Sequence, residues 1–335
     1  MRRFFLTPSS AAPLAFFRMA IAILGLLQGL WLIDSITLLY GVDGLVPWSL
    51  SKEIVYNYMP QLSWLQPLAT ATATSPDTWV CCLMGIYLFS LGGLLVGKYT
   101  RLMAVIAWAI QLMLIGTGFL AAYGVETFMH IALFYCIVMP VGSKYSLDAI
   151  GKTVVDNEWN TLAIRVLQLH LCMVYLASGL EKAMGTQWWD GEAIWQTLMQ
   201  SQFARFDMHW IAQYPWLAKM ICWSTLLIEI GYPLYIWHFR KVGYLAVVSL
   251  HLGIAIFMGL QLFAGIMIIL NTTAFGWPYL KNYFLRPAIR LIVNATTKVF
   301  NPNASNPCNN AILRILRALI STSDTWNVIP MTKEK

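Results

Sequence analysis

Long stretches without charged residues divide this sequence, and they constrain its fold more than any other feature. The stretches are about 20 residues long, the length that an α-helix needs to cross a bilayer at about 1.5 Å per residue. Charged residues make up only 11% of the 335 residues, whereas a soluble domain carries about a quarter. The sequence therefore predicts an all-α fold, a polytopic membrane helix bundle in contact with the lipid bilayer.

Eight segments of the chain qualify as membrane spans. One stretch, residues 242–280, contains no Lys, Arg, Asp or Glu over 39 residues, so it is too long for a single span. We therefore expect a tight turn near Gly259, Leu260 and Gln261 that divides it into two short spans. The predicted spans are approximately 14–33, 78–97, 102–124, 127–141, 162–180, 215–237, 242–259 and 260–277.

Two shorter segments have the pattern of amphipathic helices that lie in the membrane interface. The first is expected at residues 192–203, where Asp190 can cap the helix. The second is expected at residues 310–320. We interpret residues 1–280 as a transmembrane domain and residues 281–335 as a cytoplasmic tail that contains the second amphipathic helix.

The distribution of Lys and Arg between the loops predicts the orientation of the spans. An even number of spans places both termini on one side, and most loop Lys and Arg residues fall on that side. Positively charged loops mark the cytoplasmic side, so we expect a multi-pass protein with both termini in the cytoplasm, in the plasma membrane or a bacterial inner membrane. Because the basic residues lie in short loops, the net charge of +7 indicates topology, and no nucleic-acid partner is expected.

The cysteines indicate neither a metal site nor a disulfide framework. Five of the six lie inside apolar stretches, and none shows CxxC or Cys/His ligand spacing. We expect them to be small buried apolar residues, and we predict no metal.

Few ionisable residues lie within the spans, and such residues usually face a partner or a cavity because a charge in hydrocarbon is costly. Glu229 lies among Leu and Ile residues, so its carboxyl group must be neutral, paired or solvated. If the role of Glu229 is purely structural, its carboxyl group pairs with Arg18 or with a histidine on another helix. Lys182 at a helix end can instead extend to the interface, and this is the favoured interpretation for Arg18 and Arg165.

The fifth predicted span carries a stripe of polar and small residues on one face. Tyr175, Ser178 and Gly179 precede Lys182 by seven, four and three residues, which places all four on the same side of a helix. Such a stripe lines an interface or a pocket. A lysine withdrawn from water loses proton affinity and becomes a usable base near neutral pH.

The predicted topology allows one outward-opening cavity to gather four ionisable side chains. His130 and Lys182 lie in the outer half of the membrane, and Glu229 and His251 lie somewhat deeper. Each histidine has a structural alternative, a hydrogen bond to a neighbouring helix, so both explanations remain open for His130 and His251.

Three segments share their pattern with one known family. The first is followed by Trp188, Trp189 and Gly191, and it reads Val174-Tyr175-Leu176-Ala177-Ser178-Gly179-Leu180-Glu181-Lys182. The second begins at Phe128-Met129-His130 and ends with Tyr145-Ser146-Leu147-Asp148, and the third is His251 with Phe263 twelve residues later. Over about residues 10–280 the chain resembles the horizontally transferred transmembrane (HTTM) family, which includes the membrane domain of vitamin K-dependent gamma-carboxylase.

The resemblance implies the membrane half of the carboxylase chemistry. It implies a reduced, vitamin K-like quinone bound between helices, Lys182 as the base that takes its proton, and His130 and His251 near the developing oxyanion. Carboxylation of a peptide is not expected, because the segment after residue 280 is too short for the lumenal region that binds the protein substrate of the carboxylase. The candidate catalytic residues are Lys182, His130 and His251, and the candidate substrate-binding residues are Tyr175, Glu229, Trp188 and Trp189.

The residues leave three functions open. The first is an enzyme that binds a hydroquinone and uses Lys182 as base, with O2 as a candidate co-substrate. The second is a non-catalytic membrane subunit, or a lipid-binding or assembly protein, whose outer loops bind a membrane or extracytoplasmic protein partner. The third is a transporter of a small or lipidic solute that uses Glu229 and His251 as its coupling pair. Replacement of Lys182 by Arg discriminates among them, because arginine cannot act as a base.

Overall fold

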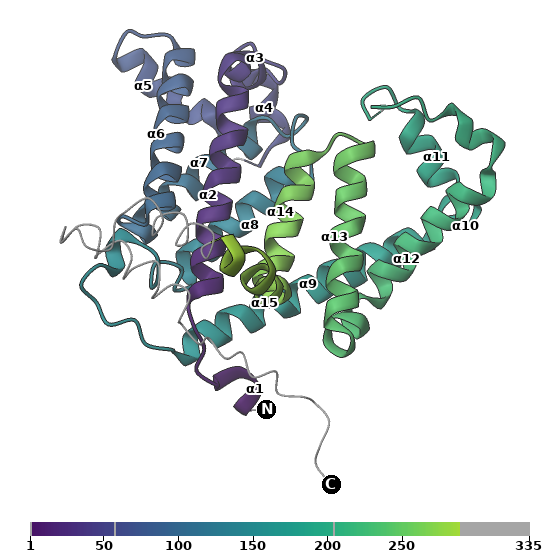
Figure 1. The fold of residues 1–335 in the computed structure, drawn as a ribbon. Helices are drawn as coiled ribbons and strands as arrows, with labels where there is room; N and C mark the ends of the chain where they lie inside the picture. The colour runs from purple at the N-terminus through teal and green to yellow at the C-terminus, as the bar shows by residue number, and fades with distance from the viewer. Residues whose placement is uncertain (1, 57, 204, 289–335) are drawn as a thin grey trace, which may run out of the picture.

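The computed structural model describes residues 2–56, 58–203 and 205–288 of the chain. These residues are built from helices and contain no strand, and an isolated β-bridge joins Ser9 to Asn157. The long helices pack beside one another as a bundle (Figure 1). The predicted all-α membrane helix bundle is confirmed.

Eight helices occupy the eight predicted spans. Seven apolar helical stretches of the described residues are long enough to cross a membrane, and α8 adds a shorter apolar helix of 15 residues. The third span ends at Thr117, earlier than predicted, because the chain turns at Gly118 against the ring of Tyr40. The eight helices are α2 (Ala12–Leu32), α6 (Pro76–Val96), α7 (Thr100–Thr117), α8 (Gly124–Val138), α9 (Glu158–Met184), α12 (Pro215–His238), α13 (Arg240–Phe257) and α14 (Gln261–Asn271).

A tight turn separates α13 from α14, at the position predicted from the long uncharged stretch. α13 ends at Phe257 and α14 begins at Gln261. Gly259 between them has a φ of +70°, a left-handed conformation that glycine adopts without strain. The predicted turn between two spans is confirmed, but the second helical stretch, Gln261–Ala288, is longer than predicted.

The helix continues beyond α14 with more residues per turn. A π-helical segment spans Thr272–Gly276, α15 spans Trp277–Tyr279, and a second π-helical segment spans Leu280–Leu285. Pro278 has no backbone N–H to bond the carbonyl four residues earlier, and Gln168 of α9 donates to that carbonyl, on Ala274, at 2.5 Å. The amphipathic helix predicted at residues 310–320 lies outside the described residues.

The long helices form two groups that meet at α14. The N-terminal group contains α2, α6, α7 and α8, and the C-terminal group contains α9, α12 and α13. α14 packs on α13 and also on α2 and α8, in agreement with its place between α2 and α13 in Figure 1. An apolar core runs through both groups and includes Phe17, Leu91, Met129, Leu171 and Phe275.

The two long connections, between α2 and α6 and between α9 and α12, contain short helices. The first holds α3 (Ile36–Tyr40), α4 (Trp48–Ile54), a 3₁₀ turn at Leu62–Leu65 and α5 (Gln66–Ala71), and the second holds α10 (Thr186–Asp190) and α11 (Glu192–Met199). The predicted cap of α11 by Asp190 is wrong, because Asp190 ends α10 and Gly191 occupies the cap. Gly191 has a φ of +92°, and a Cβ atom there would lie 2.7 Å from the backbone nitrogen of Lys219.

The cysteines of the described residues are free thiols, and their burial differs from the prediction. Cys136, Cys172 and Cys222 are buried as expected. Cys81 and Cys82 are exposed instead, because α6 turns this face away from the bundle.

Arg18 was predicted to extend to the membrane surface, but it lies inside the protein. Its side chain is 0% exposed and donates hydrogen bonds to the carbonyls of Leu94 at 2.7 Å and Leu95 at 3.0 Å, and to that of Tyr145. The last carbonyls of a helix have no partner within the helix. Arg18 therefore caps the C-terminal end of α6 from inside the bundle.

Arg165 also finds its partners within the protein rather than at the surface. Its guanidinium carbon lies 4.0 Å from the ring centroid of Phe4, in α1 (Arg2–Leu6), and its Nε donates to the Phe4 carbonyl at 3.0 Å. An arginine over an aromatic face is stabilised by a cation–π interaction. Arg165 thus attaches α1 to α9.

Candidate functional site

Lys182 and Glu229 form an ion pair between α9 and α12. Lys182 Nζ lies 2.7 Å from Glu229 Oε2 and 2.5 Å from Ser178 Oγ, one turn earlier on α9. The side chain of Lys182 is 25% exposed and that of Glu229 is 10% exposed. Glu229 is therefore paired, but its partner is Lys182 and not Arg18 or a histidine.

Gly179 brings the two helices close enough for this pair to form. A Cβ atom at position 179 would lie 2.8 Å from the backbone nitrogen of Ile230 and 2.9 Å from the Cβ atom of Glu229, which is too close for any side chain. Small residues allow helix backbones to approach one another in membranes. The stripe predicted on the fifth span is confirmed as the interface of α9 with α12.

A chain of buried hydrogen bonds joins α9, α12, α13 and α14. The hydroxyl of Tyr175 lies 2.7 Å from Nε2 of His251 and accepts a hydrogen bond of 2.8 Å from the side-chain amide of Asn271. The hydroxyl of Tyr232 donates to Oδ1 of Asn271 at 2.7 Å. All four side chains are buried, so the chain forms in a region with little water.

One arrangement of these hydrogen bonds leaves Nε2 of His251 as an acceptor. The oxygen of Tyr175 accepts from Asn271, and its hydroxyl lies 2.7 Å from His251 Nε2, to which it can donate. An imidazole that accepts at Nε2 carries its proton on Nδ1. Nδ1 is buried and has no hydrogen-bond partner among the described residues.

The ion pair and the hydrogen-bond chain lie together. Lys182 is within electrostatic range of His251, and Glu229 is within range of Tyr175. The Lys182–Glu229 ion pair thus lies beside a network of uncharged hydrogen-bonded side chains that contains His251. We call this group of residues the Lys182 cluster: Lys182, Glu229, Tyr175, His251, Asn271 and Tyr232.

The two tryptophans that follow α9 differ in their relation to the Lys182 cluster. Lys182 Nζ lies 5.5 Å from the ring centroid of Trp188, within the range of a cation–π interaction. Trp189 is 50% exposed and donates from Nε1 to the carbonyl of Ala183 at 2.8 Å. Trp188 therefore borders the amine, and Trp189 attaches α10 to the end of α9.

His130 lies outside the Lys182 cluster. Its ring stacks on Trp108 of α7, with 5.1 Å between the ring centroids. Phe128, two residues earlier and so on nearly the opposite side of α8, contacts Phe263, which also contacts His251. We expected one cavity to gather His130 with Lys182, Glu229 and His251. His130 does not join them, because the rotation of α8 turns it toward α7.

Asn271 and Tyr232 were not predicted as site residues, because the prediction began from ionisable side chains at membrane depth. A signal for Asn271 was present in the sequence. It is an amide within an uncharged apolar stretch, and buried polar groups need hydrogen-bond partners. Nothing in the spacing of the residues indicated that its partners would be Tyr175 and Tyr232.

Glu126 falls between the third and fourth predicted spans, and the structure buries it in the first turn of α8. Its carboxylate accepts hydrogen bonds of 2.8 Å from the side-chain amide of Gln28 and of 2.8 Å from the backbone nitrogen of Tyr123. This second buried carboxylate belongs to the N-terminal group of helices. It contacts no member of the Lys182 cluster through the hydrogen bonds of the described residues.

Comparisons with protein-family models, with curated proteins and with solved structures find no match to this chain. Within the described part of the chain, no three His, Cys, Asp or Glu side chains gather to hold a metal ion. A functional conclusion therefore depends on the chemistry of the Lys182 cluster.

Proposed function

We propose that this membrane protein binds a hydroquinone, or a similar lipid-soluble ring that bears an acidic hydroxyl, and deprotonates it with Lys182. The observation that carries the proposal is the Lys182–Glu229 pair, in which a partly exposed amine lies against a buried carboxylate. The resemblance of residues 174–182 to the HTTM family supports the same role. Dioxygen is the oxidant that we propose for the deprotonated ring.

The ion pair can supply a neutral amine without leaving an uncompensated charge in the membrane. When the ammonium of Lys182 passes a proton to Glu229, the pair becomes an amine and a carboxylic acid, and its net charge stays zero. The amine then accepts the proton of the ring hydroxyl, which leaves an oxyanion on the ring and a positive charge on Lys182.

His251 supports the second part of the proposal, which is stabilisation of that oxyanion. Its Nδ1 has no partner among the described residues, and in the tautomer that carries its proton there it would donate to the ring oxyanion, which lowers the barrier. Tyr175 holds the imidazole in place, and Asn271 holds Tyr175. The ring of Trp188 beside the amine offers an aromatic face on which a flat ring can stack.

Oxygen consumption by the full-length protein in lipid nanodiscs, supplied with a reduced naphthoquinone, tests the proposal. We expect consumption above autoxidation, and a decrease of about 100-fold or more in Lys182→Ala and in Lys182→Arg, because general bases contribute about that factor or more. Lys219→Ala is the matched control, since Lys219 lies on α12 beside Trp223 and outside the Lys182 cluster. Full activity in Lys182→Arg, or no consumption beyond autoxidation with any quinol, would overturn the proposal.

A non-catalytic role is the second candidate, and the closed ion pair also favours it. In this role the pair is a tie between α9 and α12, and Arg at position 182 preserves the charge and the stability. Purification would then recover a stoichiometric protein partner bound to the outer loops. A monomer without a partner that consumes oxygen would exclude this role.

A further inference from the structure

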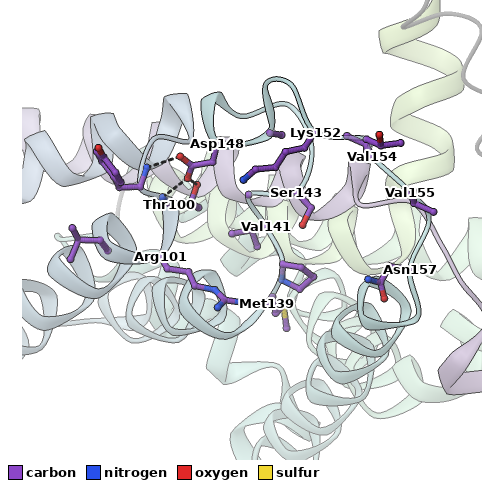
Figure 2. Close-up of a pocket in the computed structure, with 16 residues that line it drawn as sticks. Thr100, Arg101, Met139, Val141, Ser143, Asp148, Lys152, Val154, Val155 and Asn157 are labelled. Carbon is purple, nitrogen blue, oxygen red and sulfur yellow. Dashed lines mark hydrogen bonds between the residues drawn. The ribbon is translucent and has the colours of Figure 1, made fainter.

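A cavity of about 720 Å³ lies at the end of the bundle where α7 and α9 begin. Its wall comes from the first turn of α7 and from the segment 139–157 between α8 and α9 (Figure 2). α9 begins beside this cavity and carries Lys182 near its other end, so the cavity is separate from the Lys182 cluster. The polar and charged residues in the wall are Thr100, Arg101, Ser143, Asp148, Lys152, Thr153 and Asn157.

Two exposed cations in the wall have no partner. The side chains of Arg101 and Lys152 form no hydrogen bond, ion pair or ring contact within the part of the chain that the structure describes. They come from different segments, and Figure 2 shows them with Val141 and Ser143 between them. The fold therefore brings two uncompensated positive charges to one concave surface.

Asp148 is the carboxylate in this wall, and its oxygens are already bound. They accept hydrogen bonds from the backbone nitrogens of Tyr99 at 3.0 Å and Thr100 at 2.8 Å, and from the Thr100 hydroxyl at 2.9 Å (Figure 2). The bond from the Thr100 backbone is the main reason that the pKa of Asp148 lies below its ordinary value. Asp148 thus caps α7, and two cations against one carboxylate leave the wall positive.

Exposed apolar side chains border the cavity. Leu102, Val154 and Val155 belong to its wall and are exposed, and Ile150 of the same segment is 72% exposed. Cations beside exposed apolar side chains, just beyond the end of a membrane span, are typical of a surface at the depth of lipid head groups. These neighbours favour a lipid over a free anion as the occupant.

We propose that this cavity binds the head group of an anionic phospholipid. Arg101 and Lys152 pair with its phosphate, and Ser143 and Asn157 supply further donors. The acyl chains lie along the exposed face of α7 that begins at Leu102. Basic pockets at the ends of membrane helices bind anionic lipids in this manner.

Native mass spectrometry of the full-length protein in detergent, titrated with phosphatidylglycerol or phosphatidylcholine, tests the proposal. We expect Arg101→Gln/Lys152→Gln to weaken phosphatidylglycerol binding about tenfold or more, the effect of two cations near an anionic lipid. Arg3→Gln/Lys241→Gln is the matched control, because it also removes one Arg and one Lys that are exposed and lie outside the cavity wall. The control should change the affinity less than about twofold, since such charges are screened by salt.

A charge-retaining variant separates binding from folding. Arg101→Lys/Lys152→Arg should keep the preference for phosphatidylglycerol over phosphatidylcholine, and both double variants should melt at the native temperature because neither side chain has a partner in the described structure. Unchanged lipid affinity in Arg101→Gln/Lys152→Gln would overturn the proposal. An equal loss in the control, or displacement of the lipid by a large excess of inorganic phosphate, would also overturn it.

Discussion

The two groups of helices bury charged side chains in different ways. In the N-terminal group, Arg18 donates to backbone carbonyls, and Glu126 accepts from a backbone N–H and from the amide of Gln28. In the C-terminal group, Lys182 binds Glu229 and Tyr175 binds His251. Arg18 and Glu126 of the first group thus pair with groups that do not titrate, whereas Lys182 and Glu229 of the second group pair with one another.

This difference separates a structural use of buried charge from one that can serve chemistry. A backbone carbonyl or an amide cannot change its protonation state near neutral pH, so such a partner holds the fold but cannot exchange a proton with the charged group. A carboxylate or an imidazole can take or give a proton, and general acid–base chemistry needs such a partner. The same bundle therefore contains a fixed polar part beside a part that can exchange protons.

The largest effect on stability is expected from Arg18. Arg18→Met leaves the carbonyls of Leu94, Leu95 and Tyr145 without this donor, and a buried unsatisfied group costs about 1–3 kcal/mol. We expect a loss of about 3 kcal/mol or more in the free energy of unfolding, and a smaller loss in Arg18→Lys, which keeps the charge but lacks the planar fork. Thermal unfolding in detergent measures both. If Arg18→Met were as stable as the native protein, the structural role of Arg18 would be refuted.

A smaller effect is expected from the Lys182–Glu229 pair. Lys182→Met and Glu229→Leu should each lower the free energy of unfolding by about 2 kcal/mol, less than the roughly 3–5 kcal/mol of a fully buried pair, because Lys182 is 25% exposed. The double variant should lose less than the sum of the two single losses, since no unpaired charge remains. A double-mutant cycle measures this coupling. Additive losses would show that the two side chains do not act as a pair.

The smallest effect is expected from Asp148, which binds backbone N–H groups at the start of α7. Asp148→Ala should lower the free energy of unfolding by about 1 kcal/mol, as the loss of a helix cap does. The pKa of Asp148 is lowered in the folded protein, first by the backbone hydrogen bond from Thr100. Its contribution is therefore complete above the ordinary pKa of aspartate and is lost as the pH falls through the lowered value.

The pH dependence supplies the check on this third prediction. Melting temperatures of the native protein and of Asp148→Asn, measured from neutral pH into the acid range, should converge at low pH. Asparagine keeps one acceptor oxygen but does not titrate, so its curve should lack the part that Asp148 contributes. Parallel curves over the whole range would contradict the role of the carboxylate.

The sequence by itself determined where the helices lie along the chain. It also showed that buried ionisable groups such as Glu229 must be paired, neutral or solvated. Uncharged stretches of spanning length predicted the eight helices, and the turn between α13 and α14 followed from a stretch too long for one span. The apolar neighbours of Glu229 required a paired, neutral or solvated carboxyl group. These conclusions depend on local properties along the chain, namely hydropathy, spacing and the cost of burying a charge.

Only the tertiary structure decided which side chains meet. The rotation of each helix about its axis turned His130 toward Trp108, and the close approach of α12 at Gly179 made Lys182 the partner of Glu229. Arg18 was expected at the surface, but it lies at the end of α6. The packing of α2 against α6 places the unpaired carbonyls of α6 within reach of its side chain. Hydropathy sets where a helix lies in the membrane, but it contains no information on the rotation and neighbours of that helix, and these depend on packing between residues far apart in sequence.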